Sequence, residues 1–130
     1  MLIPCFNEVG HVAACLDDVF AQDYPGELLD VIVADGMSTD GTRAVLAELA
    51  ARWPQRLQVI DNPQRRQAAA LAAMVELATG DIIVRVDVHA RYAPDYVRQC
   101  VAVGAETGAD NVGGAMRPLA STPFQQALCR

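Results

Sequence analysis

The hydrophobic residues of this 130-residue chain alternate between short continuous runs and longer stretches in which they recur every three or four positions. Runs rich in Val and Ile, typical of buried β-strands, occupy residues 28–35, 56–61 and 81–87, with a three-residue run at 2–4 and a weaker candidate at 111–116. The stretches between them have the i, i+3, i+4 spacing of amphipathic helices. Their apolar positions are Val12, Cys15, Leu16, Val19 and Phe20, then Val45, Leu46, Leu49 and Trp53, then Leu71, Met74, Val75 and Ala78, and finally Val97, Cys100 and Val101.

Strands that alternate with helices predict βαβ units with right-handed crossovers. We therefore expect an α/β fold, a three-layer α/β/α sandwich with a mainly parallel sheet, formed by residues 1–130 as a single domain. The first strand is shorter than the others. We expect it to have lost residues at its start, to leave apolar surface beside the N-terminus, and to make the chain marginally stable or self-associating.

Charge and cysteine content narrow the possible partners. A net charge of −6 argues against nucleic acid and anionic membranes, which attract clustered basic residues. The pair Arg65-Arg66 stands out against this acidic background and suits a small anion. The four cysteines have no metal-binding spacing and indicate reduced thiols in a cytoplasmic protein. No apolar run approaches the roughly 20 residues of a membrane span.

Polar residues follow the predicted strands directly. Asp35, Asp61 and Asp87 stand at three strand ends, and Asn7-Glu8 follow the first strand. In open parallel sheets, ligands bind outside the carboxyl ends of the strands. An aspartate can also form a turn or cap a helix, but together these residues indicate a ligand site at one edge of the sheet.

Four segments carry a resemblance to a known family. They are IPCFNE (3–8), VIVADGMSTDGT (31–42), RRQAAALAAMVELATGDIIVRVD (65–87) and RYAPDYV (91–97). In this order and spacing they resemble the family 2 glycosyltransferases, which have the GT-A fold, and within that family the bacterial exopolysaccharide glycosyltransferases of the succinoglycan type. The resemblance implies a nucleotide-diphospho-sugar donor, with a UDP-sugar favoured, and a saccharide or lipid-linked acceptor in polysaccharide biosynthesis.

The resemblance also implies roles for residues at the strand ends. Pro4, Phe6 and Glu8 would line the nucleotide pocket, and Asp35 would accept a hydrogen bond from the base. Glu8 can instead be an acidic residue in the first turn of a helix, and Phe6 can be a core residue. Asp40 and Thr42 are expected to cap a helix.

The basic pair is assigned to the diphosphate. A guanidinium of Arg65 or Arg66 offers forked donors to phosphate oxygens. One of the two is expected to be a solvated residue at the start of a helix, and the sequence does not distinguish them.

The segment RVDVHARY (85–92) suggests a metal site. Asp87 and His89 are two positions apart, so an extended backbone would direct both side chains to one divalent cation. The family pattern has a second aspartate where this chain has His89. Oxygen ligands suit both Mg²⁺ and Mn²⁺, whereas an imidazole ligand favours Mn²⁺. The expected cofactor is therefore a divalent cation, either Mn²⁺ or Mg²⁺. The alternative is a polar turn, and His11 is expected to be a surface residue.

The chain stops soon after the metal-site strand. By resemblance, a second half would carry the catalytic base, the acceptor site and, in many exopolysaccharide enzymes, membrane helices. We therefore expect the donor-binding half of a glycosyltransferase, with a non-catalytic nucleotide-binding or regulatory domain as the alternative. A nucleotidyltransferase lacks support because CFNE has neither glycine nor lysine. A dinucleotide-binding oxidoreductase is disfavoured because no GxGxxG follows a strand.

Overall fold

The computed structural model describes residues 1–114 and divides the chain into two compact units, Met1–Arg98 and Gln99–Arg130. The first unit contains three strands and most of the helices. In chain order the elements are β1 (Leu2–Cys5), α1 (Val12–Phe20), a 3-10 turn (Gly26–Leu28), β2 (Val31–Asp35), α2 (Thr42–Arg52), β3 (Leu57–Asp61), α3 (Gln67–Leu77) and α4 (Tyr96–Thr107). Within the described residues, no helix is long and apolar enough to cross a membrane.

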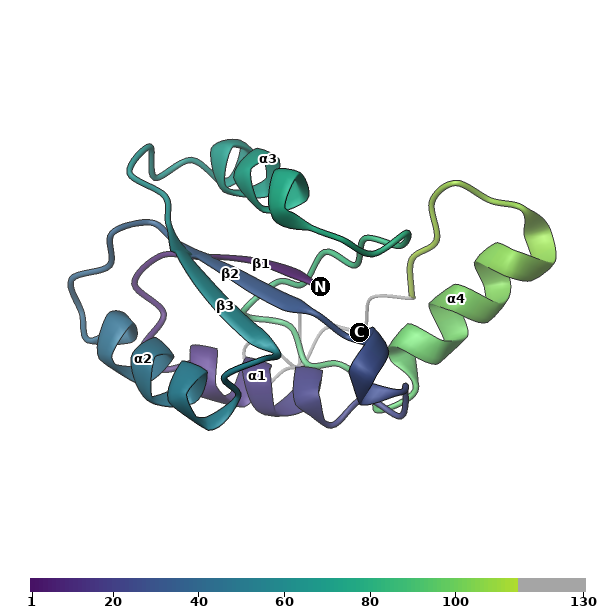
Figure 1. Ribbon diagram of the computed structural model, residues 1–130, viewed down its shortest axis with the longest axis horizontal. Coiled ribbons are helices and arrows are strands. Elements are labelled where there is room, and N and C mark those ends of the chain that lie inside the picture. Colours follow the sequence, from purple (N-terminus) through teal and green to yellow (C-terminus); the bar gives the residue numbers. More distant parts are fainter. Residues whose placement is uncertain (115–130) are drawn as a thin grey trace, which may run out of the picture. The chain divides into compact units, whose positions relative to one another are not determined.

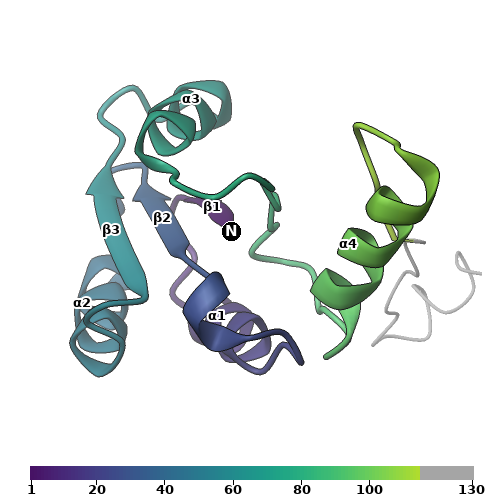
Figure 2. The ribbon, with the colours of Figure 1, turned by 45° about the vertical axis from the view of Figure 1, so that its right-hand side comes forward.

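The three strands form one parallel sheet in the order β1-β2-β3. Helices α1 and α2 cover one face of this sheet and α3 covers the other (Figures 1 and 2). The predicted α/β/α arrangement with a parallel sheet is therefore confirmed. The register aligns Cys5 with Asp35 and Asp35 with Asp61, so the carboxyl ends of the strands lie side by side at one edge.

The core has two layers because successive residues of a strand point to opposite faces of the sheet. On the α3 side, residues of β1 and β2 form a buried cluster with α3, made of Leu2, Ile32, Ala34, Ala70 and Met74. On the other side, the alternate strand residues Ile3 and Val33 are also fully buried, as are Leu16 of α1 and Leu46 of α2. The helical periodicity of the sequence thus locates the core correctly on both faces.

The predicted strand over residues 81–87 is wrong in extent. The structure has only a single parallel bridge between Leu2 and Arg85, made by Leu2 N donating to Val84 O (2.8 Å) and Val86 N donating to Leu2 O (2.9 Å). The next bond of this ladder would need an N–H on Pro4, which proline lacks. The ladder therefore stops after one bridge.

Apolar surface lies near the N-terminus, as expected, although the first strand itself is covered. Met1, Leu2 and Ile3 are buried, whereas Ile82 and Ile83, next to the bridge with Leu2, are exposed. The weak candidate strand 111–116 is not formed over residues 111–114, and its last two residues lie outside the described part of the chain.

Candidate functional site

Each of the three strands is followed by a loop that contains a left-handed residue. These residues are Asn7 (φ 55°) after β1, Met37 (φ 62°) after β2 and Arg65 (φ 54°) after β3. A positive φ is uncommon for a residue with a side chain, and it is maintained only where surrounding contacts determine the backbone. The carboxyl edge of the sheet is thus built from loops of defined, strained conformation.

Hydrogen bonds join the loop after β1 to the loop after β2. Asn7 N donates to Ser38 Oγ (2.7 Å), and Thr39 N donates to Asn7 Oδ1 (2.9 Å). One residue further on, Glu8 N donates to Thr42 Oγ1 (2.8 Å). These contacts span more than thirty residues of sequence and fix the position of Glu8 relative to α2.

Asp40 and Thr42 were expected to cap α2, but the N-cap residue is Gly41, and Asp40 lies one residue before it. Its carboxylate accepts the backbone N–H of Thr42 (3.0 Å) and the Thr42 hydroxyl (2.6 Å), and it also accepts the N–H of Val9 (3.1 Å). These bonds, led by that from the Thr42 hydroxyl, lower the pKa of Asp40 below its ordinary value. Asp40 therefore has a structural role at the start of α2 and also holds the first loop.

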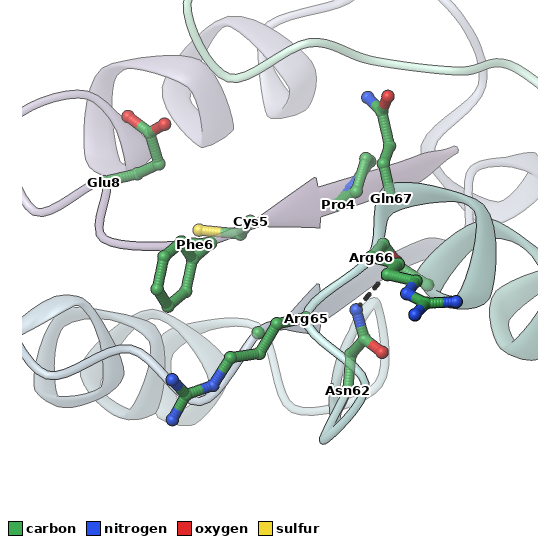
Figure 3. A pocket seen from close by; sticks show the side chains of 10 residues that line it. Pro4, Cys5, Phe6, Glu8, Asn62, Arg65, Arg66 and Gln67 are labelled. Atoms are coloured by element: carbon green, nitrogen blue, oxygen red, sulfur yellow. Dashed lines mark hydrogen bonds between the residues drawn. The ribbon is translucent and has the colours of Figure 1, made fainter.

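The loops enclose a hollow of about 170 Å³ at the carboxyl edge. Figure 3 shows its lining, to which the β1 end, the residue after β2 and the segment 62–70 contribute. The lining residues are Pro4, Cys5, Phe6, Glu8, Gly36, Asn62, Arg65, Arg66, Gln67 and Ala70. Pockets for drug-sized ligands measure roughly 300–1,000 Å³, so this open hollow accommodates part of a nucleotide sugar rather than all of it.

Five residues predicted from the sequence lie around this hollow: Pro4, Phe6, Glu8, Arg65 and Arg66. The structure also separates the two arginines (Figure 3). The guanidinium of Arg65 extends to the Phe6 ring, with Cζ 5.8 Å from the ring centroid, whereas that of Arg66 points another way.

Phe6 is not a core residue, because 44% of it remains exposed. Its ring packs over Gly36, where an added Cβ would come within 3.1 Å of the ring. A larger residue at position 36 would therefore push the Phe6 ring outward by a few tenths of an ångström. The exposed part of the ring lies beside the guanidinium of Arg65 at the mouth of the hollow.

Asp35 does not line the hollow, but it directly precedes Gly36, which does. Its side chain is 1% exposed. One oxygen, Oδ2, accepts from Arg43 Nη1 (2.7 Å) and Ser38 N (3.1 Å). The other oxygen, Oδ1, is buried and has no hydrogen-bond partner in the structure. An unsatisfied buried carboxylate oxygen is costly, and it marks a position where a ligand donor would be favourable.

Arg43 links two of the strand-end aspartates. Its Nη1 donates to Asp61 Oδ1 (2.8 Å) as well as to Asp35 Oδ2. The bonds to Asp61 and Asp35 raise the pKa of Arg43. Sequence reasoning did not identify this residue, since nothing in a helical stretch shows that one arginine reaches two neighbouring strand ends.

The geometry expected for Asp87 and His89 is wrong. The backbone is not extended there, because Ala90 N donates to Asp87 O (3.1 Å) and closes a turn. Asp87 Oδ1 accepts the backbone N–H of His89 (2.9 Å), and Asp87 N donates to the Tyr92 hydroxyl (2.8 Å). A short polar side chain that can bond to the backbone two residues on favours such a turn over a strand.

His89 contacts Glu8 and His11. Its Nε2 lies 2.8 Å from Glu8 Oε1, and the two imidazole rings meet edge to face with centroids 4.8 Å apart. One potential ligand atom from each of Glu8, His11 and His89 lies within 4.8 Å of the other two, in a cluster that does not include Asp87. The imidazoles and carboxylates at this edge are a suitable donor set for a divalent cation.

Two cysteines close to the site are buried thiols. Burial, followed by the nearby carboxylates of Asp35 and Glu8, raises the pKa of Cys5 to about 12. Burial also raises the pKa of Cys15 to about 12, with Asp18 as the next cause. Neither thiol has the lowered pKa of a nucleophile, so Cys5 contributes shape to the hollow rather than reactivity.

Fold and site together define a parallel α/β domain whose sheet edge presents an aromatic ring, arginines and carboxylates to a ligand. The family model described as "Glycosyl transferase family 2" matches residues 1–125, and the chain belongs to this family.

Similar proteins agree with this assignment and with the resemblance to succinoglycan enzymes. The chain is 40% identical over 129 residues to the "Succinoglycan biosynthesis protein ExoA" of Rhizobium meliloti (strain 1021), covering 98% of this chain and 38% of that protein. It is 28% identical over 114 residues to "Glycosyltransferase AglE" of Haloferax volcanii, covering 88% of this chain and 38% of that protein. The chain therefore spans about two fifths of the length of these relatives.

Among solved structures, the chain resembles a mannosyltransferase from Pyrobaculum calidifontis in complex with GDP-Man and Mn²⁺. The TM-score is 0.76 with 33% identity, covering 82% of this chain and 32% of that chain. S. aureus TarS in complex with UDP has the same fold, with a TM-score of 0.67 and 19% identity, over 89% of this chain and 37% of that chain.

Proposed function

We propose that this chain binds the sugar-nucleotide donor of a glycosyltransferase, which transfers a sugar to a saccharide or lipid-linked acceptor in polysaccharide biosynthesis. Family membership and the similarity to a succinoglycan biosynthesis protein support this proposal. The similar mannosyltransferase structure, which holds GDP-Man and Mn²⁺, supports a nucleotide-diphospho-sugar and a divalent cation as ligands.

The observation that carries the proposal is the hollow at the carboxyl edge. It combines the half-exposed ring of Phe6 with the guanidinium of Arg65, which extends to that ring, and Arg66 also lines the hollow. An aromatic face suits a base or ribose, and guanidinium groups suit phosphate oxygens. A nucleoside diphosphate has both parts in one molecule.

Asp35 favours uracil over guanine as the base. Its Oδ2 already accepts from Arg43 and Ser38, so the buried Oδ1 is the one oxygen of this carboxylate that lacks a donor, and we assign it to the base. A single acceptor matches the one imide N–H of uracil or thymine. Guanine has adjacent N–H groups that would need two acceptors. We therefore propose UDP-sugars as donors.

The cation would be held by Asp87 and His89 together with the diphosphate. Asp87 uses Oδ1 to bind the backbone N–H of His89, and its other carboxylate oxygen is the one we assign to the ion. A divalent cation bound there supplies a Lewis acid that stabilises the negative charge of the departing nucleoside diphosphate. The carboxylate and imidazole pair supports Mn²⁺ more than Mg²⁺.

A calorimetric titration with UDP, GDP and TDP, each with Mn²⁺ or with EDTA, tests this proposal. UDP should bind more tightly than GDP, and Mn²⁺ should strengthen the binding. The neighbouring variants Arg65→Gln and Arg66→Gln form a matched pair. Because Arg65 reaches the Phe6 ring and Arg66 does not, the first should lose about tenfold more affinity for UDP. Equal affinity for all three nucleotides, or no dependence on Mn²⁺, would contradict the proposed ligand.

A further inference from the structure

The nucleotide site involves Glu8 and His89, but it does not explain why His11 lies beside them. Two imidazoles and a carboxylate converge, with ligand atoms within 4.8 Å of one another, and these imidazoles belong to the only two histidines of the whole chain. We propose that these three side chains form a site for a transition-metal ion such as Zn²⁺, which binds without nucleotide.

Glu8 and His11 are held together by the turn that begins α1. The carbonyl of Glu8 accepts the N–H groups of His11 and Val12, both at 2.9 Å, so the two ligands lie three residues apart in a closed turn. The bond from Glu8 N to Thr42 Oγ1 fixes this turn against α2. The backbone that carries both ligands is therefore ordered before any ion binds.

His89 is brought to the same place by a loop attached to α1. The turn at Asp87 fixes the backbone of His89. Two residues later, Arg91 makes a two-pronged ion pair with Asp18 of α1, at 2.5 and 2.8 Å. That bond is the main cause of the lowered pKa of Asp18. Because α1 positions His11 and also anchors the loop of His89, the three ligands share one rigid support.

Helix capping does not account for His11. It occupies the N-cap position of α1, but its side chain makes no capping hydrogen bond, and histidine is not among the residues preferred there. Its ring instead meets the edge of the His89 ring. A hydrogen bond between Glu8 and His89 alone would not require a second imidazole at this distance.

The donor set indicates which kind of ion fits. Two imidazole nitrogens and one carboxylate oxygen form a recognised ligand set for Zn²⁺, whereas Mg²⁺ favours oxygen ligands alone. Bonds of 2.0–2.1 Å in a tetrahedron place ligand atoms about 3.3 Å apart. The Glu8–His89 pair at 2.8 Å and the 4.8 Å limit for the cluster bracket this spacing, so side-chain adjustments of roughly 1 Å suffice.

Three protein ligands leave one position of a tetrahedral ion open. The side chain of His89 is 61% exposed and His11 is exposed, so water has access to this position. Glu8 also lines the hollow, which places the ion beside the proposed nucleotide site. Because His89 is assigned to both sites, Zn²⁺ should compete with Mn²⁺ for it.

The test uses the whole chain with metal alone. Zn²⁺ titrations by calorimetry and the visible spectrum of added Co²⁺ should show one ion per chain, with the intense d–d bands of a low-coordinate site. His11→Ala, His89→Ala and Glu8→Gln should each weaken Zn²⁺ binding by at least tenfold. Asp17→Asn removes an exposed charge from α1 as a matched control for Glu8→Gln, and it should leave the affinity unchanged within about twofold.

Asp87→Asn separates this site from the nucleotide-dependent one. It preserves an Oδ1 acceptor for His89 N, so Zn²⁺ binding should persist while the Mn²⁺ dependence of UDP binding falls. The proposal would be overturned if the parent chain did not bind Zn²⁺, or if His11→Ala bound Zn²⁺ as tightly as the parent. It would also be overturned if Asp87→Asn lost as much Zn²⁺ affinity as the three ligand variants. A near-ultraviolet thiolate band with Co²⁺ would also overturn it, by showing a cysteine ligand. If Zn²⁺ binds as expected but UDP does not, the proposed function fails and this site stands.

Discussion

Replacing Asp35 with asparagine should separate nucleotide binding from stability. The substitution preserves the size of the side chain and an oxygen that can accept from Ser38 N, but it replaces the other oxygen with an NH₂ group. If the base donates to Oδ1, that hydrogen bond is lost and two donors face each other. Hydrogen bonds to charged groups contribute about 1.5–3 kcal/mol, so the affinity for UDP should fall by roughly 10- to 150-fold.

The stability of the fold should respond much less. Removing one partner of a buried ion pair costs about 3–5 kcal/mol when it leaves a buried charge uncompensated. Here the remaining partner, Arg43, is 46% exposed and retains Asp61 at 2.8 Å. The substitution also removes a charged group whose Oδ1 is buried without a partner. These opposing effects should leave the free energy of unfolding within about 1 kcal/mol of the parent value.

The matched control is Asp61→Asn, which breaks a contact with the same guanidinium at an exposed strand end. UDP titrations by calorimetry and urea denaturation of the parent and both variants provide the comparison. Asp35→Asn should lose UDP affinity without losing stability, and Asp61→Asn should change neither by much. If the two variants bind UDP equally well, or if Asp35→Asn loses affinity only because it unfolds, the assignment of the base to Asp35 is wrong.

Two further predictions concern the core and the buried thiols. Met74 is fully buried between α3 and the sheet, so Met74→Ala should lower the free energy of unfolding by about 2–5 kcal/mol, measured by urea denaturation. The exposed neighbour Val75→Ala should change it little. Cys5 and Cys15 remain protonated in the folded state up to a pKa of about 12, against an ordinary value of 9.0. The raised pKa of these thiols contributes to the free energy of unfolding in full below pH 9, and this contribution is lost as the pH rises from 9 towards 12. In urea denaturation, Cys5→Ala should therefore lose less stability over this pH range than the parent. At pH 8, peptide mapping after iodoacetamide should find Cys100 modified before either buried thiol.

The periodicity of hydrophobic residues predicted the fold because each element buries a contiguous apolar face. Leu16, Leu46 and Met74 were assigned to helix cores from spacing alone, and all three are fully buried. The strand over residues 81–87 could not be judged in this way. Its Val and Ile content fits a strand, but its length depends on the partner, and the missing N–H of Pro4 interrupts the ladder.

The site was predictable where it follows from strand ends, and not where it depends on contacts between distant segments. Phe6, Glu8 and Arg65 lie within four residues of a strand end, so the parallel sheet brings their loops to one edge. Arg43 lies on α2 and was not identified, and His11, at the N-cap of α1, was expected to be a surface residue. Their positions beside Asp35 and His89 result from how α2 and α1 pack, which local sequence does not encode.

The left-handed residues connect these observations to binding. Asn7, Met37 and Arg65 each adopt a conformation that costs roughly 1–3 kcal/mol for a residue with a side chain, and each follows a different strand. The cost at Asn7 is offset locally, because its backbone N–H and its side-chain oxygen both bond to the loop after β2. At Arg65, the N–H donates to Asn62 O (3.0 Å) and the guanidinium lies against Phe6. The loops are therefore ordered by bonds to one another before a ligand arrives. A ligand that enters the hollow meets Arg65 and Phe6 already in place, so little of its binding free energy is spent on ordering these loops.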